Sequence, residues 1–179
     1  AERQFRFPLE YGGQRTPTSQ WTATAAGAVV LAKNGDGPYI THVTPGRIRD
    51  KGIKDANNMG AAMAWAAYDT ISQHLKDTNR SSSFYDLIVT GDLGKLGMEI
   101  VIDLFAADGI ELRGNYNDCG IMLFDLEGQD VHCGASGCGC AASVLTGYLL
   151  NGMREGKWNN LLVCATGAWH SPTSLGQGE

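Results

Sequence analysis

The densest group of chemistry-bearing residues runs from His132 to Cys140, in the order His-Cys-Gly-Ala-Ser-Gly-Cys-Gly-Cys. Thiolate and imidazole groups are common zinc ligands, but Cys138 and Cys140 lie only two positions apart and no second paired motif occurs. A thiol at a helix start is also a candidate nucleophile, because its pKa falls there. Buried cysteine packs as a small hydrophobe, and we favour this structural interpretation. We therefore predict no metal ligand and no cofactor.

The same stretch can bind an anion through its backbone. A glycine-rich turn ahead of a helix exposes N–H groups, and the helix dipole favours negative charge there. His132 precedes this turn and can donate a hydrogen bond to a carboxylate, although a histidine in such a place is often a satisfied loop or core residue. We expect His132 and Gly134 to belong to a ligand-binding site.

Two further segments supply candidate ligand-binding residues. The apolar run from Asp86 to Thr90 reads as a strand and is followed by Gly91 and Asp92. Ligands of open α/β sheets bind beyond the carboxyl ends of the strands, so both residues are candidates, with helix capping as the alternative role of Asp92. Arg15, in the early loop, can pair with a carboxylate through two hydrogen bonds or stay solvated.

The elements that must position these residues follow from the apolar pattern. An uninterrupted apolar run or an alternating one predicts a strand, and an apolar stripe at helical spacing predicts a helix. Residues 110–131 give mixed signals and are predicted as mostly loop, with a short strand at Ile121–Phe124. The other predicted elements are strands at Thr22–Ala32, Tyr39–Thr44, Asp86–Thr90 and Leu161–Thr166, and helices over 56–75, from about Leu96 to Asp108, and from about Ala142 to Met153. This order indicates a layered α/β fold.

Composition excludes several function classes. The formal net charge is −5 with scattered basic residues, which is not the footprint of a nucleic-acid binder. No stretch reaches the roughly 18 apolar residues of a membrane span, and the N-terminus carries no signal-peptide pattern. The five cysteines, an odd number, indicate reduced thiols rather than a disulfide framework.

Longer strings of residues resemble a known family. The loop from His132 to Gly137 is similar to the histidine-containing glycine loop of thiolases and condensing ketosynthases, with one residue fewer between His and Gly. The more specific strings resemble the stage V sporulation protein AD (SpoVAD) family, of the thiolase-like superfamily, and they extend over almost the whole chain: Ala1–Pro8, Glu10–Arg15, Asp86–Lys95, Tyr116–Gly120 and Ser136–Cys140.

The resemblance implies a thiolase-like layered α/β fold. It assigns residues 1–33 to the tail and last strand of a missing first half. Residues 34–179 would form the second half, a βαβαβ unit that is incomplete at its C-terminal end. We therefore expect this sequence to be a piece of a longer protein, which would form a homodimer when full length.

The resemblance also implies a function. It places Gly91 where ketosynthases have a catalytic histidine, and it places the thiolase cysteine near Ala165, one position from Cys164. We therefore expect no catalytic residue and no enzyme activity. The implied role is binding of dipicolinic acid, a small planar dicarboxylate, alone or as its calcium chelate, for uptake into the developing spore through a degenerate thiolase-like pocket.

Alternatively, the chain is an acyltransferase or condensing enzyme of thiolase type, acting on acyl-CoA or acyl-carrier substrates. For the binding role, the resemblance implies that membrane proteins of the same sporulation operon are partners. It also implies a peripheral location on the cytoplasmic face of the forespore inner membrane.

Overall fold

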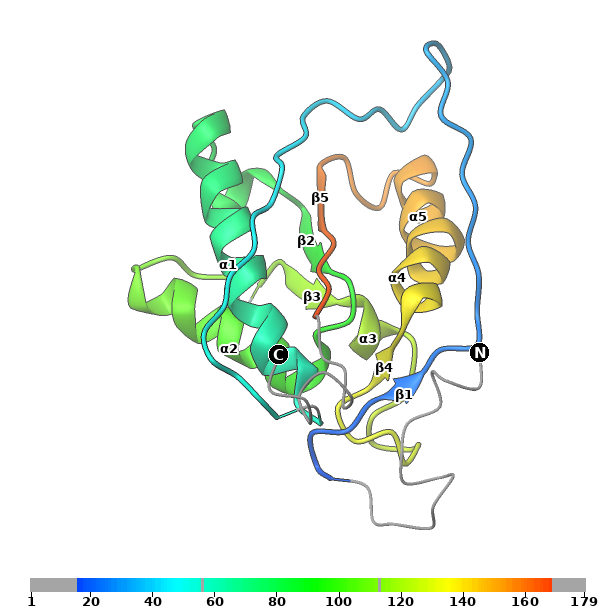
Figure 1. Ribbon diagram of the computed structural model, residues 1–179. Helices are drawn as coiled ribbons and strands as arrows, with labels where there is room; N and C mark the ends of the chain where they lie inside the picture. The colour runs from blue at the N-terminus through cyan, green and yellow to red at the C-terminus, as the bar shows by residue number, and fades with distance from the viewer. Residues whose placement is uncertain (1–15, 56, 113, 169–179) are drawn as a thin grey trace.

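The computed structural model describes residues 16–55, 57–112 and 114–168. Its centre is a parallel sheet in the order β3-β2-β5, with β2 in the middle (Figure 1). A second, two-residue parallel pair joins β1 to β4. The strands are β1 (Trp21–Thr22), β2 (Leu87–Thr90), β3 (Tyr116–Asp118), β4 (Ala135–Ser136) and β5 (Leu161–Cys164).

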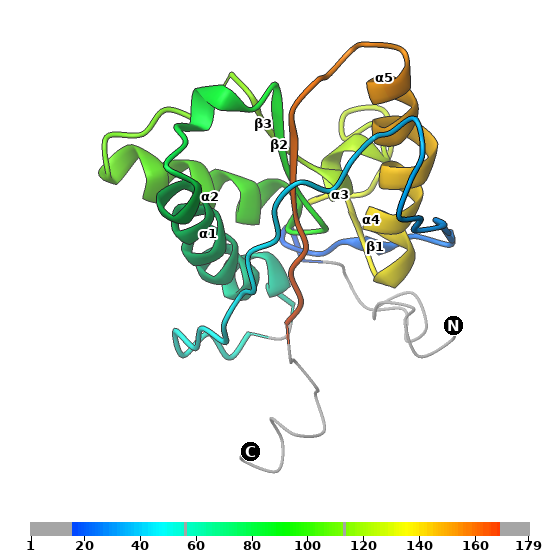
Figure 2. The ribbon, with the colours of Figure 1, turned by 90° about the horizontal axis from the view of Figure 1, so that it is seen from above.

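Helices cover both faces of the central sheet. Seen from above, α1 and α2 lie on one side of the sheet, and α4 and α5 lie on the other (Figure 2). The helices are α1 (Met59–Thr78), α2 (Gly94–Ala107), α3 (Cys119–Met122), α4 (Cys138–Val144) and α5 (Leu150–Arg154), with a 3₁₀ turn η2 (Ser82–Phe84) and a π-helical turn η3 (Leu145–Leu149) between α4 and α5. The predicted α/β class is confirmed, and this layering is consistent with a thiolase-like fold.

The predicted long helices are confirmed, with shifted ends. Asn58 caps the start of α1 by accepting a hydrogen bond from the Ala61 amide, and Asn79 ends it in the left-handed conformation. The alanine-rich face of α1 packs on the sheet, and its side chains Ala64 and Ala67 are fully buried. The predicted strands at 86–90 and 161–166 correspond to β2 and β5, and the helix before Met153 corresponds to α4, η3 and α5.

Two predicted strands, Thr22–Ala32 and Tyr39–Thr44, are wrong. Apart from Thr22 in β1, their residues belong to no sheet, because no backbone hydrogen bond joins residues 24–44 to another described segment. We call residues 24–44 the extended segment. Many of its apolar side chains are exposed, including Val30 at 94% and Val43 at 79%. A strand needs a neighbouring strand for its N–H and C=O groups, and sequence pattern alone does not supply one.

The prediction for residues 110–131 also needs correction. The short strand is β3, Tyr116–Asp118, rather than Ile121–Phe124. The Asp118 side chain accepts a hydrogen bond from the Gly120 amide and so caps α3. Because α3 begins directly after β3, Ile121 becomes helical.

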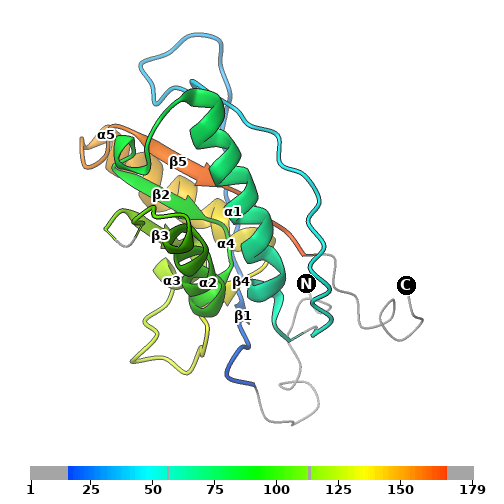
Figure 3. The ribbon, with the colours of Figure 1, turned by 90° about the vertical axis from the view of Figure 1, so that its left-hand side faces the viewer.

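Residues following the extended segment are tied to α1, along which they run (Figure 3). Arg47 donates two hydrogen bonds to Asp69 of α1, and Arg49 donates another to the same carboxylate. Thr44, the last residue of the extended segment, also contacts α1, because its hydroxyl lies 2.8 Å from the His74 ring. Among the described residues, no helix combines the length and apolar character needed to cross a membrane.

Candidate functional site

The carboxyl ends of the three central strands form one edge of the sheet. Because the strands are parallel, the residues that follow β2, begin α3 after β3, and follow β5 meet at this edge. These residues are Gly91 to Gly94, Asp118 to Gly120, and Ala165 to Gly167. The predicted residues Gly91 and Asp92 therefore lie where ligands of open α/β sheets bind.

Asp118 is fully buried at this edge, and its carboxylate accepts four hydrogen bonds. The donors are the amides of Leu93, Gly94 and Gly120, at 3.0, 2.9 and 2.9 Å, and the hydroxyl of Thr90, at 2.6 Å. Burial raises the pKa of Asp118, and the four hydrogen bonds oppose that rise. This carboxylate links the end of β2, the start of α2 and the start of α3.

Three glycines allow the loops at this edge to touch backbone to backbone. A Cβ on Gly94 would lie 2.5 Å from the Cys133 carbonyl oxygen, one on Gly120 2.5 Å from the Ala135 oxygen, and one on Gly134 2.4 Å from the Gly120 oxygen. Gly94 and Gly134 also have positive φ angles, of 69° and 100°. We call Gly94, Gly120 and Gly134 the glycine junction. It brings the predicted residue Gly134 against the loops that follow β2 and β3.

The side chain of Asp92 contacts the N-terminal end of α4. Its carboxylate accepts a hydrogen bond of 2.9 Å from the amide of Gly137, the residue that precedes α4. Asp92 is not the N-cap residue of α2, because the residue directly before that helix is Leu93. The Gly137 amide therefore already has a carboxylate partner within the protein. Binding of a ligand anion at this turn stays a prediction.

His132 connects its loop to the segment before β1. Its Nδ1 atom donates to the Thr16 carbonyl at 2.6 Å and lies 3.2 Å from the Ser19 hydroxyl. Its Nε2 atom is 3.1 Å from a carboxylate oxygen of Asp130, whose side chain is 77% exposed. A ligand carboxylate that bound Nε2 would replace the exposed Asp130 there.

Gly91 is buried and lies close to the main chain of Thr166. A Cβ added to Gly91 would be 3.6 Å from the Ala141 Cβ atom and 3.9 Å from the Thr166 amide nitrogen, which is ordinary van der Waals contact. The Thr166 hydroxyl oxygen is buried and has no hydrogen-bond partner among the described residues. The Gly91 carbonyl accepts a weak hydrogen bond from the Cys140 thiol, at 3.7 Å. This corner therefore has a hydrogen-bonding group that the protein leaves unsatisfied.

The cysteines behave as packing residues. Cys119, Cys133, Cys140 and Cys164 are buried, and Cys138 is exposed. Burial raises the pKa of Cys119 and of Cys164 to about 12, and it also raises that of Cys140. Thiols with such pKa values stay protonated at neutral pH and are poor nucleophiles. In the described ranges, no group of three or more His, Cys, Asp or Glu side chains is arranged to hold a metal ion.

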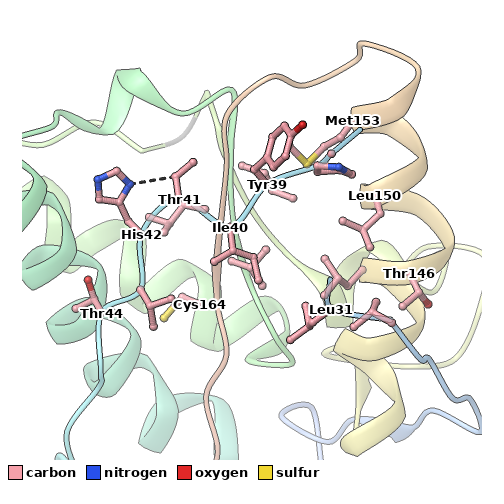
Figure 4. A pocket seen from close by; sticks show the side chains of 18 of the residues that line it. Leu31, Tyr39, Ile40, Thr41, His42, Thr44, Thr146, Leu150, Met153 and Cys164 are labelled. Atoms are coloured by element: carbon pink, nitrogen blue, oxygen red, sulfur yellow. Dashed lines mark hydrogen bonds between the residues drawn. The ribbon is translucent and has the colours of Figure 1, made fainter. Parts of the chain in front are cut away.

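A separate cavity of about 770 Å³ lies between the extended segment and β5 (Figure 4). Leu31, Tyr39 and Ile40 point into it from one side, and Leu150 and Met153 from the other. None of the predicted site residues lines it. One wall is the extended segment, which no backbone hydrogen bond joins to another described segment. We therefore place the candidate site at the sheet edge instead.

The structure thus places four of the five predicted site residues in the loops around the sheet edge. Gly91 and Asp92 follow β2, Gly134 belongs to the glycine junction, and His132 precedes it. Arg15 lies outside the described residues. Sequence reasoning missed Thr166 and Asp118, although Thr166 ends a predicted strand directly before a glycine. Asp118 lies within the stretch 110–131 that is predicted as mostly loop.

Comparisons with known proteins identify the family of this chain. The sequence model of the family described as stage V sporulation protein AD (SpoVAD) matches residues 1–179. A stage V sporulation protein AD of Bacillus subtilis (strain 168) is 47% identical over 179 residues, which are 100% of this chain and 53% of that relative. The chain therefore spans about half the length of this relative. It belongs to the stage V sporulation protein AD family.

Proposed function

We propose that the sheet edge forms part of a non-catalytic binding site for dipicolinic acid, which the protein binds for uptake into the developing spore. The observation that carries the proposal is the Thr166 hydroxyl, which is buried and has no hydrogen-bond partner among the described residues, on a residue whose main chain lies beside Gly91. A buried hydroxyl without a partner costs about 1–3 kcal/mol. A carboxylate oxygen of the ligand would accept a hydrogen bond from it and remove that cost.

The charges at the site favour the calcium chelate as the bound form. Asp92 places a carboxylate beside the same loop, and Cys140, whose thiol bonds to Gly91, feels its negative charge. A free dicarboxylate would be repelled by Asp92, whereas the chelate of dipicolinate with Ca²⁺ carries no net charge. Calcium also prefers carboxylate oxygen ligands, which Asp92 can offer.

Membership of a sporulation family supports the wider biological proposal. We propose that the protein acts at the cytoplasmic face of the forespore inner membrane, as a peripheral partner of membrane proteins from the same operon. We also propose that it is a homodimer when full length, and that the part of the relatives outside this chain supplies the rest of the site.

The test is Thr166→Val in the longest natural polypeptide that contains this chain. Valine keeps the shape of threonine but removes the hydroxyl. Folding stability should stay equal or rise, because no described residue forms a hydrogen bond with this hydroxyl. Calorimetry with dipicolinate, with and without Ca²⁺, should show affinity weakened about tenfold or more, the loss expected for one hydrogen bond to a charged group.

Thr146→Val is the matched control. The Thr146 hydroxyl already donates to the Ala142 carbonyl at 2.8 Å, and Thr146 lines the separate cavity of Figure 4. We expect its affinity to stay within about twofold of wild type. If only the Thr146 variant binds more weakly, the ligand binds in that cavity and not at the sheet edge. Absence of binding by wild type, together with turnover of an acyl-CoA, would replace the proposal with the acyltransferase function.

A further inference from the structure

Asp118 performs a task that a nearby residue performs in most helices. The first amides of a helix lack partners within the helix, and a side chain just before the helix commonly accepts from them. At α2, the residue before the helix is Leu93, which offers no acceptor. The amides of Leu93 and Gly94 donate instead to Asp118, which lies 24 and 25 residues further along the chain.

The same carboxylate also holds the other side of the loop. Thr90, the last residue of β2, donates its hydroxyl to Asp118, and that hydroxyl lies 3.0 Å from the Tyr116 hydroxyl. Gly91 and Asp92 are therefore fixed from both sides in the sequence. The residue before them and the residues after them all bind one buried carboxylate.

We propose that Asp118 is a positioning residue, which holds Gly91 and Asp92 in place for the ligand without touching it. This inference rests on the proposed function for its ligand but not for its geometry. A carboxylate accepts at all four of its lone-pair positions. An asparagine amide presents two N–H donors in place of one oxygen. The Thr90 hydroxyl can turn and accept from them, but a main-chain amide cannot, so at least one of the three amides would lose its acceptor. The loop would then lose its anchor while the sheet remained.

The chain contains a matched control for this proposal. Asp86 lies at the opposite end of β2, and its carboxylate accepts hydrogen bonds from the amides of Asn159 and Asn160, at 2.7 and 2.9 Å. Asp86→Asn therefore also removes a carboxylate that binds main-chain amides. It does so far from the candidate site.

Two readouts test Asp118→Asn against Asp86→Asn in the longest natural polypeptide that contains this chain. Hydrogen exchange of the Leu93, Gly94 and Gly120 amides should accelerate about tenfold or more in Asp118→Asn, while amides in the middle of α1 keep their wild-type rates. Dipicolinate affinity should fall about tenfold in Asp118→Asn and stay within about twofold in Asp86→Asn. A merely structural role would instead accelerate exchange in α1 as well.

Unchanged exchange at these three amides in Asp118→Asn would overturn the proposal, as would equal losses of affinity in the two variants. If wild type binds no dipicolinate, the proposed function fails, while the exchange rates still decide whether Asp118 positions the loop.

If Asp118→Asn does not fold, the double variant Thr90→Val with Tyr116→Phe replaces it. This variant removes the hydroxyl donor together with its own partner and leaves the carboxylate on three amides. We expect faster exchange at Leu93, which shares an oxygen with Thr90, than at Gly94, which binds the other oxygen. Wild-type exchange at Leu93 would overturn the proposal.

Discussion

Replacing Gly97 by alanine tests how closely α1 and α2 must approach. A Cβ on Gly97 would lie 2.8 Å from the Gly60 carbonyl oxygen and 2.9 Å from the Gly60 Cα atom. Both atoms belong to the backbone of α1, so neither can move without shifting the helix. Gly147 provides the contrast, because it lies in the η3 turn with nothing within 4 Å of an added Cβ.

The expected magnitudes follow from two opposing terms. Alanine is favoured over glycine inside a helix by about 1 kcal/mol, which applies to both positions. Inserting a methyl group into a tightly packed contact costs about 1–3 kcal/mol, which applies only to Gly97. Gly97→Ala should therefore lower the free energy of unfolding by about 1–2 kcal/mol, because backbone atoms limit relaxation. Gly147→Ala should raise it by about 0.5–1 kcal/mol.

Urea unfolding followed by circular dichroism measures both variants in the longest natural polypeptide that contains this chain. The two midpoints should move in opposite directions, with unchanged slopes. A Gly97→Ala variant as stable as wild type would refute the packing argument, since the helix-propensity gain alone would then account for the result. Gly60 contacts the Leu93 carbonyl, so the same clash would also disturb the loop that precedes α2.

Two further predictions concern protonation. The hydrogen bond from Arg47 holds the pKa of Asp69 well below its usual range, so this ion pair stabilises the fold above about pH 4 and loses that effect as pH falls. In Asp69→Asn, the free energy of unfolding should therefore change less between pH 6 and pH 3 than it does in wild type. Asp103 is an exposed carboxylate on α2, and Asp103→Asn should keep the wild-type pH dependence. Equal pH dependence in the two variants would contradict this. Iodoacetamide at pH 8 should modify the exposed Cys138 of the native protein quickly and Cys119 only after unfolding, because the pKa of Cys119 is about 12. Mass spectrometry that finds equal rates at both cysteines would show that Cys119 is accessible.

The helices could be predicted from sequence because their determinants are local. The alanine-rich pattern of α1 and the asparagines that flank it specify both its buried face and its ends. The extended segment shows the opposite case. Its run from Ala25 to Ala32 has strand composition, but a strand also needs a partner, and none of the described segments pairs with it. Composition predicts what a segment can form, and pairing decides whether it does.

The candidate site was predictable only in part, for a similar reason. Gly91 and Asp92 follow a recognisable strand, so their position at the sheet edge could be predicted. Asp118 is recognisable only from its contacts, because three of its four donors lie 24 to 28 residues earlier in the sequence. Thr166, two residues past the end of β5, stands out only because its hydroxyl has no partner among the described residues, and this is a property of three-dimensional packing.

The glycine junction has a consequence for recombination between homologues. Its residues Gly94, Gly120 and Gly134 come from three separate stretches of sequence, yet each excludes a side chain because of backbone from another stretch. In a chimera with a crossover between residues 94 and 134, the contacting loops come from two different parent proteins and did not evolve together. Crossovers placed after residue 140 leave the junction intact, so libraries of chimeric SpoVAD proteins should contain more folded members when the stretch from Gly91 to Cys140 is inherited as one block.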